Sequence, residues 1–269
     1  MGHGIAHAAM AGGYDTRMYD VSETSLQKGA AAIEAILGKG VELGKIQPAD
    51  AEVLRHRLTT TSTIEQALEG ADLVIEAAPE RIDLKLGLLA EVDRVAPASA
   101  IVATNTSALS ITEMAGSMKR PSRVAGMHFF NPVHKMKLIE IVQALESAPE
   151  TLEAIEAVAR RMGKETVLVR ESPGFITTRV NASIGNEAFY MLMEGVASAR
   201  DIDKALKLGL NHPMGPFELV DLVGLDTRLS ILEYLHRSMG EKYRPCPLLV
   251  QYVQAGRLGR KVGRGVYEY

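Results

Sequence analysis

Short apolar runs that alternate with longer helical patterns are the feature of this sequence that most restricts its fold. Residues 73–78 and 100–104 are each about as long as a strand, and each stops at polar or turn-forming residues. Continuous apolar runs of this length are typical of parallel strands that helices cover on both faces. Amphipathic patterns typical of helices occupy residues 22–44, 48–58, 85–95 and 149–162. The alternation predicts an α/β fold with a doubly wound sheet.

The pattern changes after Glu171. Ser172-Pro173-Gly174-Phe175 interrupts it, and beyond Ile176 the sequence contains helical patterns and no convincing strand. The length of 269 residues is enough for two domains with well-filled cores. We therefore predict an α/β domain over residues 1–171, followed by an all-helical domain over residues 172–269.

Composition excludes several classes of protein. The net charge is −3 and no run of Lys or Arg occurs, so we expect no nucleic-acid partner. No apolar run approaches the ~20 residues that a membrane helix needs, and no secretion signal is visible. The single cysteine excludes an internal disulfide framework. We expect a cytoplasmic protein without a metal site.

The first twenty residues resemble the second half of a βαβ unit. Residues 1–13 predict an Ala-rich helix ended by glycines, and residues 14–19 predict a strand that stops at Asp20. Gly2 and Asp20 have the spacing of the last glycine and the ribose-binding acid of a dinucleotide-binding fingerprint. The leading glycines and their strand would lie before residue 1. On these residues alone, a generic βαβ fragment is an equally good interpretation.

Residues 127–142 carry the strongest chemical signal. His128 ends a predicted strand, Asn131-Pro132 bends the chain, and alternation then places Glu140 on the apolar face of the next strand. A carboxylate on such a face needs a partner, and the bend returns the chain to His128. The pair would hold one imidazole tautomer for general acid–base chemistry. The alternative is that Glu140 pairs with a lysine at a strand end and His128 is a hydrogen-bonded core histidine.

Two further candidates follow from their position. Glu80 and the segment Asn105-Thr106-Ser107 come directly after the two apolar runs. Ligands of open α/β sheets bind at the carboxyl ends of the strands, so these residues are candidate site residues. Turn formation and helix capping are strong alternative roles for single residues of these types.

Several segments occur in the order found in the 3-hydroxyacyl-CoA dehydrogenases, which the chain resembles over essentially its whole length. They are Asn105-Thr106-Ser107, His128-Phe129-Phe130-Asn131-Pro132, Lys137-Leu138-Ile139-Glu140, Pro173-Gly174-Phe175, Pro213-Met214-Gly215-Pro216-Phe217-Glu218 and the ending Gly259-Arg260-Lys261-Val262-Gly263-Arg264-Gly265-Val266-Tyr267. Within the family, the chain is similar to the short bacterial enzymes that act on 3-hydroxybutyryl-CoA.

The resemblance implies a Rossmann-type first domain, NAD as the cofactor and roles for individual residues. His128 resembles the catalytic base, Glu140 the carboxylate that orients it, and Ser107 the serine between substrate and nicotinamide. The remaining positions that match cofactor contacts are Gly2, Asp20, Glu80, Lys85, Asn131 and Lys261. An acid at position 20 favours NAD over NADP, because a 2′-phosphate would meet a like charge.

The implied reaction is reversible oxidation of an (S)-3-hydroxyacyl-CoA to the 3-oxoacyl-CoA, in fatty-acid or butanoate metabolism, by a homodimer formed through the helical domain. Two alternatives stay open. The first keeps the chemistry but changes the substrate to a dicarboxylic 3-hydroxyacyl-CoA or a sugar acid. The second is a weakly active NAD-binding structural homologue.

The chain departs from the family pattern at two places. The first strand of the Rossmann domain is absent, so we expect either that the natural protein begins upstream or that this chain binds NAD poorly. The helix after Pro173-Gly174-Phe175 has Thr178 where the family usually has an asparagine. We expect Thr178 to contact the substrate in part, with Asn181, almost one turn further on, as a substitute.

Overall fold

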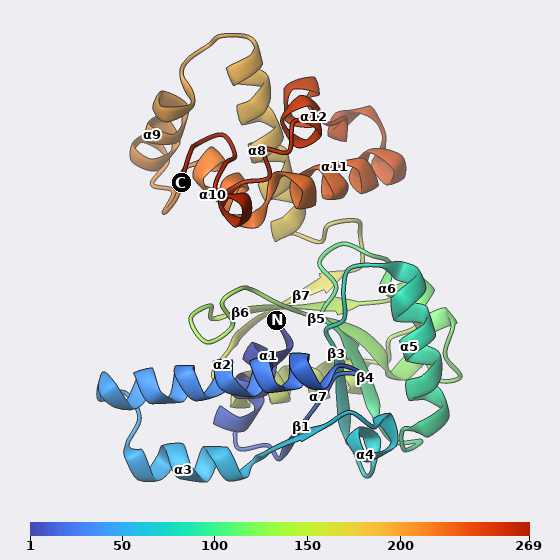
Figure 1. Ribbon diagram of the computed structural model, residues 1–269. Coiled ribbons are helices and arrows are strands. Elements are labelled where there is room, and N and C mark those ends of the chain that lie inside the picture. The colour runs from blue at the N-terminus through green and yellow to red at the C-terminus, as the bar shows by residue number, and fades with distance from the viewer. The chain divides into compact units, whose positions relative to one another are not determined.

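The computed structural model describes residues 1–269, which form two compact units, Met1–Glu171 and Ser172–Tyr269. The first unit contains all seven strands, and the second is built from helices (Figure 1). The expected fold class, a Rossmann-type α/β domain followed by a helical domain, is confirmed.

The strands of the first unit form two separate sheets. β1 (Thr16–Tyr19) pairs in parallel with β2 (Leu58–Thr61). The larger sheet has the order β3-β4-β5-β6-β7. Its strands are β3 (Leu73–Glu76), β4 (Ile101–Thr104), β5 (Val124–Phe129), β6 (Leu138–Gln143) and β7 (Glu165–Arg170). β3, β4 and β5 are parallel, β6 runs antiparallel to β5, and β7 is parallel to β6.

Helices of the first unit connect these strands. Most begin near the predicted residues, but the helix predicted over residues 85–95 begins at Ile82. They are α1 (Gly2–Ala11), α2 (Glu23–Glu42), α3 (Pro48–His56), α4 (Ile64–Leu68), α5 (Ile82–Val95), α6 (Ile111–Gly116) and α7 (Pro149–Arg161). The Ser22 and Ser110 side chains cap α2 and α6 by accepting hydrogen bonds from the backbone three residues on. Proline occupies the first turn of α3 and of α7, where its missing N–H costs nothing.

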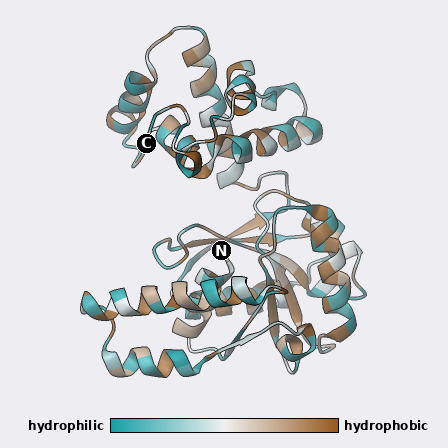
Figure 2. Ribbon diagram, in the orientation of Figure 1, coloured by the Kyte–Doolittle hydropathy of each residue, from teal (hydrophilic) through white to brown (hydrophobic).

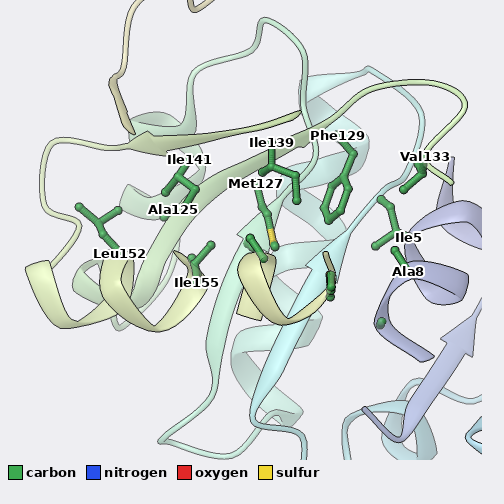
Figure 3. Packing of buried hydrophobic residues seen from close by; sticks show 14 residues of the cluster. Ile5, Ala8, Ala125, Met127, Phe129, Val133, Ile139, Ile141, Leu152 and Ile155 are labelled. Atoms are coloured by element: carbon green, nitrogen blue, oxygen red, sulfur yellow. The ribbon is translucent and has the colours of Figure 1, made fainter. Parts of the chain in front are cut away.

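Alternation along β5 separates a packing face from a chemical face. Ala125, Met127 and Phe129 belong to the core cluster formed with α1 and α7 (Figure 3). Gly126 and His128 point to the opposite face. A Cβ built on Gly126 would lie 2.4 Å from Ile111 Cδ1 and 2.8 Å from Val142 Cβ, so α6 and β6 close tightly over it. The strand is therefore held on both faces, which fixes the position of His128.

The second unit is a set of helices around one apolar core. They are α8 (Thr177–Met193), α9 (Ala199–Gly209), α10 (Pro216–Val223), α11 (Leu225–Met239) and α12 (Pro247–Gln254). Phe189 and Phe217 meet edge to face with ring centroids 5.2 Å apart inside this core. Figure 2 shows that these helices carry hydrophobic and hydrophilic residues on different sides, as amphipathic helices do.

One strand has no clear signal in the sequence. Residues 58–61 form β2, although Leu-Thr-Thr-Thr is too short and too polar to resemble a buried strand. Three of its four residues are not buried, so the segment has no apolar pattern typical of a strand. It is a strand because its backbone pairs in parallel with β1.

The chain end folds back onto the helical core through Asp221, which is 1% exposed. Its Oδ1 accepts a hydrogen bond from the Val266 N–H at 2.8 Å, and its Oδ2 accepts bonds from the Tyr267 N–H and the Tyr269 hydroxyl, both at 2.9 Å. A single buried carboxylate therefore satisfies three donors of the tail.

We predict that Asp221→Ala lowers the free energy of unfolding by about 3 kcal/mol, because it leaves buried donors of the tail without an acceptor. Urea unfolding followed by circular dichroism measures the change. Glu233→Ala, which removes an exposed carboxylate from α11, is the matched control and should change stability by no more than about 0.5 kcal/mol. Equal midpoints for the two variants would contradict the assigned role.

Candidate active site

His128 and Glu140 form a buried pair across the antiparallel strands β5 and β6. The two residues lie directly opposite each other in the strand register. Nδ1 of His128 is 2.7 Å from Oε2 of Glu140, and the residues are 5% and 0% exposed. The expected contact between His128 and Glu140 is therefore present. A histidine held in this way at a strand end can exchange a proton through its other ring nitrogen.

A second buried ion pair lies at the carboxyl end of β3. The Lys85 ammonium donates to both Glu76 oxygens, at 2.8 and 2.9 Å, and to the Ala78 carbonyl at 3.1 Å. Thr104, the last residue of β4, donates its hydroxyl to Glu76 at 2.6 Å. Both charged side chains are 1% exposed. The arrangement ties the ends of two neighbouring strands together and satisfies all donors of the lysine.

Glu80 holds the loop that carries Ser107. Its Oε1 accepts hydrogen bonds from the Thr106 hydroxyl at 2.6 Å, from the Ser107 N–H at 2.8 Å and from the Ala108 N–H at 3.2 Å. Its Oε2 is 3.6 Å from the Lys85 ammonium, and 43% of the side chain is exposed. Glu80 is therefore bound to this loop and remains partly open to solvent. The Ser107 hydroxyl makes no hydrogen bond within the chain.

The two asparagines of this region have different environments. Asn105 accepts a hydrogen bond from the Phe129 N–H at 2.8 Å, which connects the end of β4 to the end of β5 beside His128. Asn131 is exposed and precedes Pro132 in a cis peptide bond. Both residues follow the carboxyl ends of parallel strands, where open sheets bind ligands.

The start of α1 and the end of β1 offer the groups that a dinucleotide needs. The Gly2 and His3 N–H groups lie in the first helical turn without an acceptor. A Cβ built on Gly2 would meet nothing within 4 Å, so a ligand can approach the backbone there. Asp20 accepts one hydrogen bond, from the Ser22 N–H to Oδ1 at 2.9 Å, which leaves Oδ2 to accept another. Free donors for a pyrophosphate and an acceptor for a ribose hydroxyl fit NAD.

The other two predicted site residues belong to the helical unit. Thr178 lies in the first turn of α8 and is partly exposed. Lys261 forms an ion pair with Asp226, with its ammonium 2.6 Å from both carboxylate oxygens. Their expected contacts with substrate and cofactor remain predictions.

Glu76 and Thr104 are members of the site that the sequence does not single out. Glu76 lies within the apolar run 73–78 and Thr104 ends the run 100–104, and such runs predict core strands. A signal was nevertheless present, because a glutamate inside an apolar strand needs a buried cation, and Lys85 follows it by nine residues.

No helix has the length and apolar character needed to cross a membrane. No group of three or more His, Cys, Asp or Glu side chains has the arrangement of a metal site.

Removing one member of the buried Glu76–Lys85 pair should cost more than removing both. We predict that Lys85→Met lowers the free energy of unfolding by about 3–5 kcal/mol, because Glu76 is left buried and charged. The double variant Glu76→Met/Lys85→Met should recover part of this loss, as chemical denaturation will measure. Lys39→Met, which breaks the exposed pair with Glu42, is the control and should have almost no effect. A Lys85→Met protein as stable as the wild type would refute the prediction.

Comparison with known proteins assigns the family. The family profile described as 3-hydroxyacyl-CoA dehydrogenase, NAD binding domain, matches residues 1–172, and the C-terminal domain profile of the same family matches residues 174–269. A probable 3-hydroxybutyryl-CoA dehydrogenase of Bacillus subtilis is 46% identical over 270 residues, covering 100% of this chain and 94% of the relative.

Two further relatives agree with this assignment. The crystal structure of a (S)-3-hydroxybutyryl-CoA dehydrogenase from Ralstonia eutropha superimposes with a TM-score of 0.97 at 42% identity, covering 100% of this chain and 95% of that one. A 3-hydroxyadipyl-CoA dehydrogenase of Escherichia coli is 41% identical over 271 residues, covering 100% of this chain and 57% of the relative. The first unit is an NAD-binding domain, and the chain belongs to the 3-hydroxyacyl-CoA dehydrogenase family of oxidoreductases.

Proposed function

We propose that this protein catalyses the reversible NAD-dependent oxidation of a short-chain (S)-3-hydroxyacyl-CoA, with 3-hydroxybutyryl-CoA as the preferred substrate, to the 3-oxoacyl-CoA. The observation that carries the proposal is the buried His128–Glu140 pair at the end of β5, in a chain of this family. The names of the Bacillus and Ralstonia relatives support the choice of a four-carbon acyl chain.

His128 acts as the base in this proposal. With Nδ1–H donating to Glu140, the proton-accepting lone pair lies on Nε2, which takes the proton of the substrate 3-hydroxyl. The Glu140 carboxylate fixes this tautomer and stabilises the imidazolium that forms. NAD supplies the hydride acceptor when bound, so the C3–H bond breaks as the C3=O bond forms. In the reverse direction, His128 returns the proton to the oxygen.

Ser107 stabilises the oxygen that gains negative charge. Its N–H is held by Glu80, so its hydroxyl sits on a fixed loop and can donate to the substrate oxygen. Thr178 supplies a further hydroxyl contact to the substrate, with Asn181 as its substitute. Besides Ser107, five positions contact the cofactor in this proposal: Gly2, Asp20, Glu80, Asn131 and Lys261. The buried Lys85 ammonium lies 3.6 Å from Glu80 and contributes to the cofactor site through that carboxylate.

The assembly proposed is a cytoplasmic homodimer formed through the helical unit. Exposed apolar side chains of that unit support it, among them Val180, Leu222 and Val223, which are 52%, 51% and 41% exposed.

We predict that the protein reduces acetoacetyl-CoA with NADH and that His128→Ala lowers kcat by about 10²–10⁴-fold, because proton transfer loses its catalyst. Glu140→Gln should lower kcat as well, since an amide cannot stabilise the imidazolium. Loss of NADH absorbance measures the rate. His56→Ala, at a histidine whose side chain is 80% exposed, is the control. Absence of acetoacetyl-CoA reduction by the wild type would overturn the proposed function.

For the substrate contact, we predict that Thr178→Ala lowers kcat/KM by about tenfold, equivalent to the loss of one hydroxyl hydrogen bond. Thr178→Ala/Asn181→Ala should have the larger effect. Glu187→Ala, at an exposed residue of the same helix, serves as the control. If both the single and the double variant turn over at the wild-type rate, neither residue contacts the substrate.

A further inference from the structure

The loop that joins β5 to β6, residues 130–137, carries Asn131, a cofactor contact of the proposed function. Only one side chain of this loop, Val133, is buried, and Asn131 itself is exposed. A loop with so few buried apolar contacts opens easily. A fixed position for Asn131 therefore requires contacts other than side-chain packing within the loop.

Lys164 supplies such contacts from the turn between α7 and β7. Its ammonium donates hydrogen bonds to the carbonyl oxygens of Val133 and Met136, the latter at 2.8 Å. Its own N–H donates to the Ala159 carbonyl in the last turn of α7, at 3.0 Å, and Glu165 begins β7 directly after it. The lysine is therefore fixed between two regular elements and bridges two points of the loop.

The ammonium is committed to the loop backbone. Both of its hydrogen-bond acceptors are carbonyl oxygens, and neither is a carboxylate. Burial lowers the pKa of the Lys164 ammonium, which shows that its surroundings disfavour the charge. Hydrogen bonds from a charged donor are about twice as strong as those between neutral groups. An apolar side chain at this position would avoid the cost of burial, but it would not hold the loop.

A second contact determines where the loop is held. Val133 packs on α1 near Ile5 (Figure 3), and a Cβ built on Gly4 would lie only 3.0 Å from Val133 Cβ. The first N–H groups of α1 are the free donors described above for a pyrophosphate. By bonding the Val133 carbonyl, Lys164 keeps the loop on this helix. All of these residues belong to the first unit.

We propose that Lys164 is a positioning residue of the cofactor site. By bridging the carbonyls of Val133 and Met136, it holds the loop where Asn131 contacts NAD. This inference rests on the proposed function, in which Asn131 is a cofactor contact.

The position of His128 does not depend on this bridge. β5 and β6 pair directly with each other, and His128 is bonded to Glu140 of the neighbouring strand. Loss of the bridge should therefore weaken cofactor binding and leave the chemical step intact. A purely structural role would have a different effect, because fewer folded molecules lower the apparent kcat and leave KM unchanged.

The first test removes the bridging donors. We predict that Lys164→Met raises the Kd of NADH, measured by fluorescence titration, by about tenfold, because one cofactor contact is lost. Its kcat with acetoacetyl-CoA should change by less than about threefold. Lys164→Arg, which keeps charged donors, should restore part of the affinity. Lys119→Met, at an exposed lysine that follows α6, is the control and should leave the Kd unchanged.

Hydrogen exchange without cofactor tests the loop itself. The Lys135 and Met136 N–H groups both donate to the Pro132 carbonyl, at 3.0 and 3.1 Å, so their exchange reports on the loop. These amides should exchange at least about tenfold faster in Lys164→Met, whereas the amides of β5 and β6 should keep their protection. Lys164→Gln, whose amide still donates but has no charge, should show a smaller change and replaces Lys164→Met if that variant does not fold.

A double-mutant cycle identifies the contact through which Lys164 acts. In an Asn131→Ala background, Lys164→Met should raise the Kd of NADH by less than about threefold, because both substitutions remove the same contact.

Three results would overturn the proposal: an unchanged Kd or unchanged loop exchange in a folded Lys164→Met protein, additive losses in the cycle, or a lower kcat with an unchanged KM for NADH. Failure of the proposed function gives a different result. A wild type that binds NADH but does not reduce acetoacetyl-CoA would refute that function, while a raised Kd in Lys164→Met would still support the positioning role.

Discussion

The contact between His128 and Glu140 depends on the antiparallel register of β5 and β6, and much of the first unit serves to maintain that register. In this register His128 lies opposite Glu140, and Gly126 lies opposite Val142. A slip by one residue would turn Glu140 toward the apolar face that packs on α1 and α7. Packing on both faces prevents this slip: Met127 and Ile139 are 0% exposed on one side, and Ile111 closes over Gly126 on the other.

The unit contains two buried carboxylates, and their partners give them different properties. Glu76 is surrounded by donors, including the Lys85 ammonium and the Thr104 hydroxyl, so it connects the ends of two strands. Glu140 meets a histidine, whose second ring nitrogen can still gain or lose a proton. Rigid strand ends and one titratable ring are a suitable combination for acid–base catalysis, because the base is positioned before the substrate arrives.

Arg228 of α11 differs from both, because its Nε is buried without a hydrogen bond. A fold tolerates such a group only if the rest of the core is stable enough to carry its cost. The helical unit has that core, with Phe189, Phe217 and Leu232 each 0% exposed.

The sequence by itself determined the class of fold, the change of architecture after Glu171 and the need of Glu140 for a partner. These follow from local periodicity, from turn residues and from the cost of a carboxylate on an apolar strand, all of which act within short stretches. The structure then decided that this partner is His128. Only the tertiary structure decided that β2 is a strand, that Glu76 pairs with Lys85, and that Glu80 holds the Ser107 loop. It also decided that the Nε of Arg228 is buried without a hydrogen bond. Each of these contacts joins two segments that are separate in the sequence. The local pattern of one segment does not show which other segment it packs against, because the packing of the whole unit decides that.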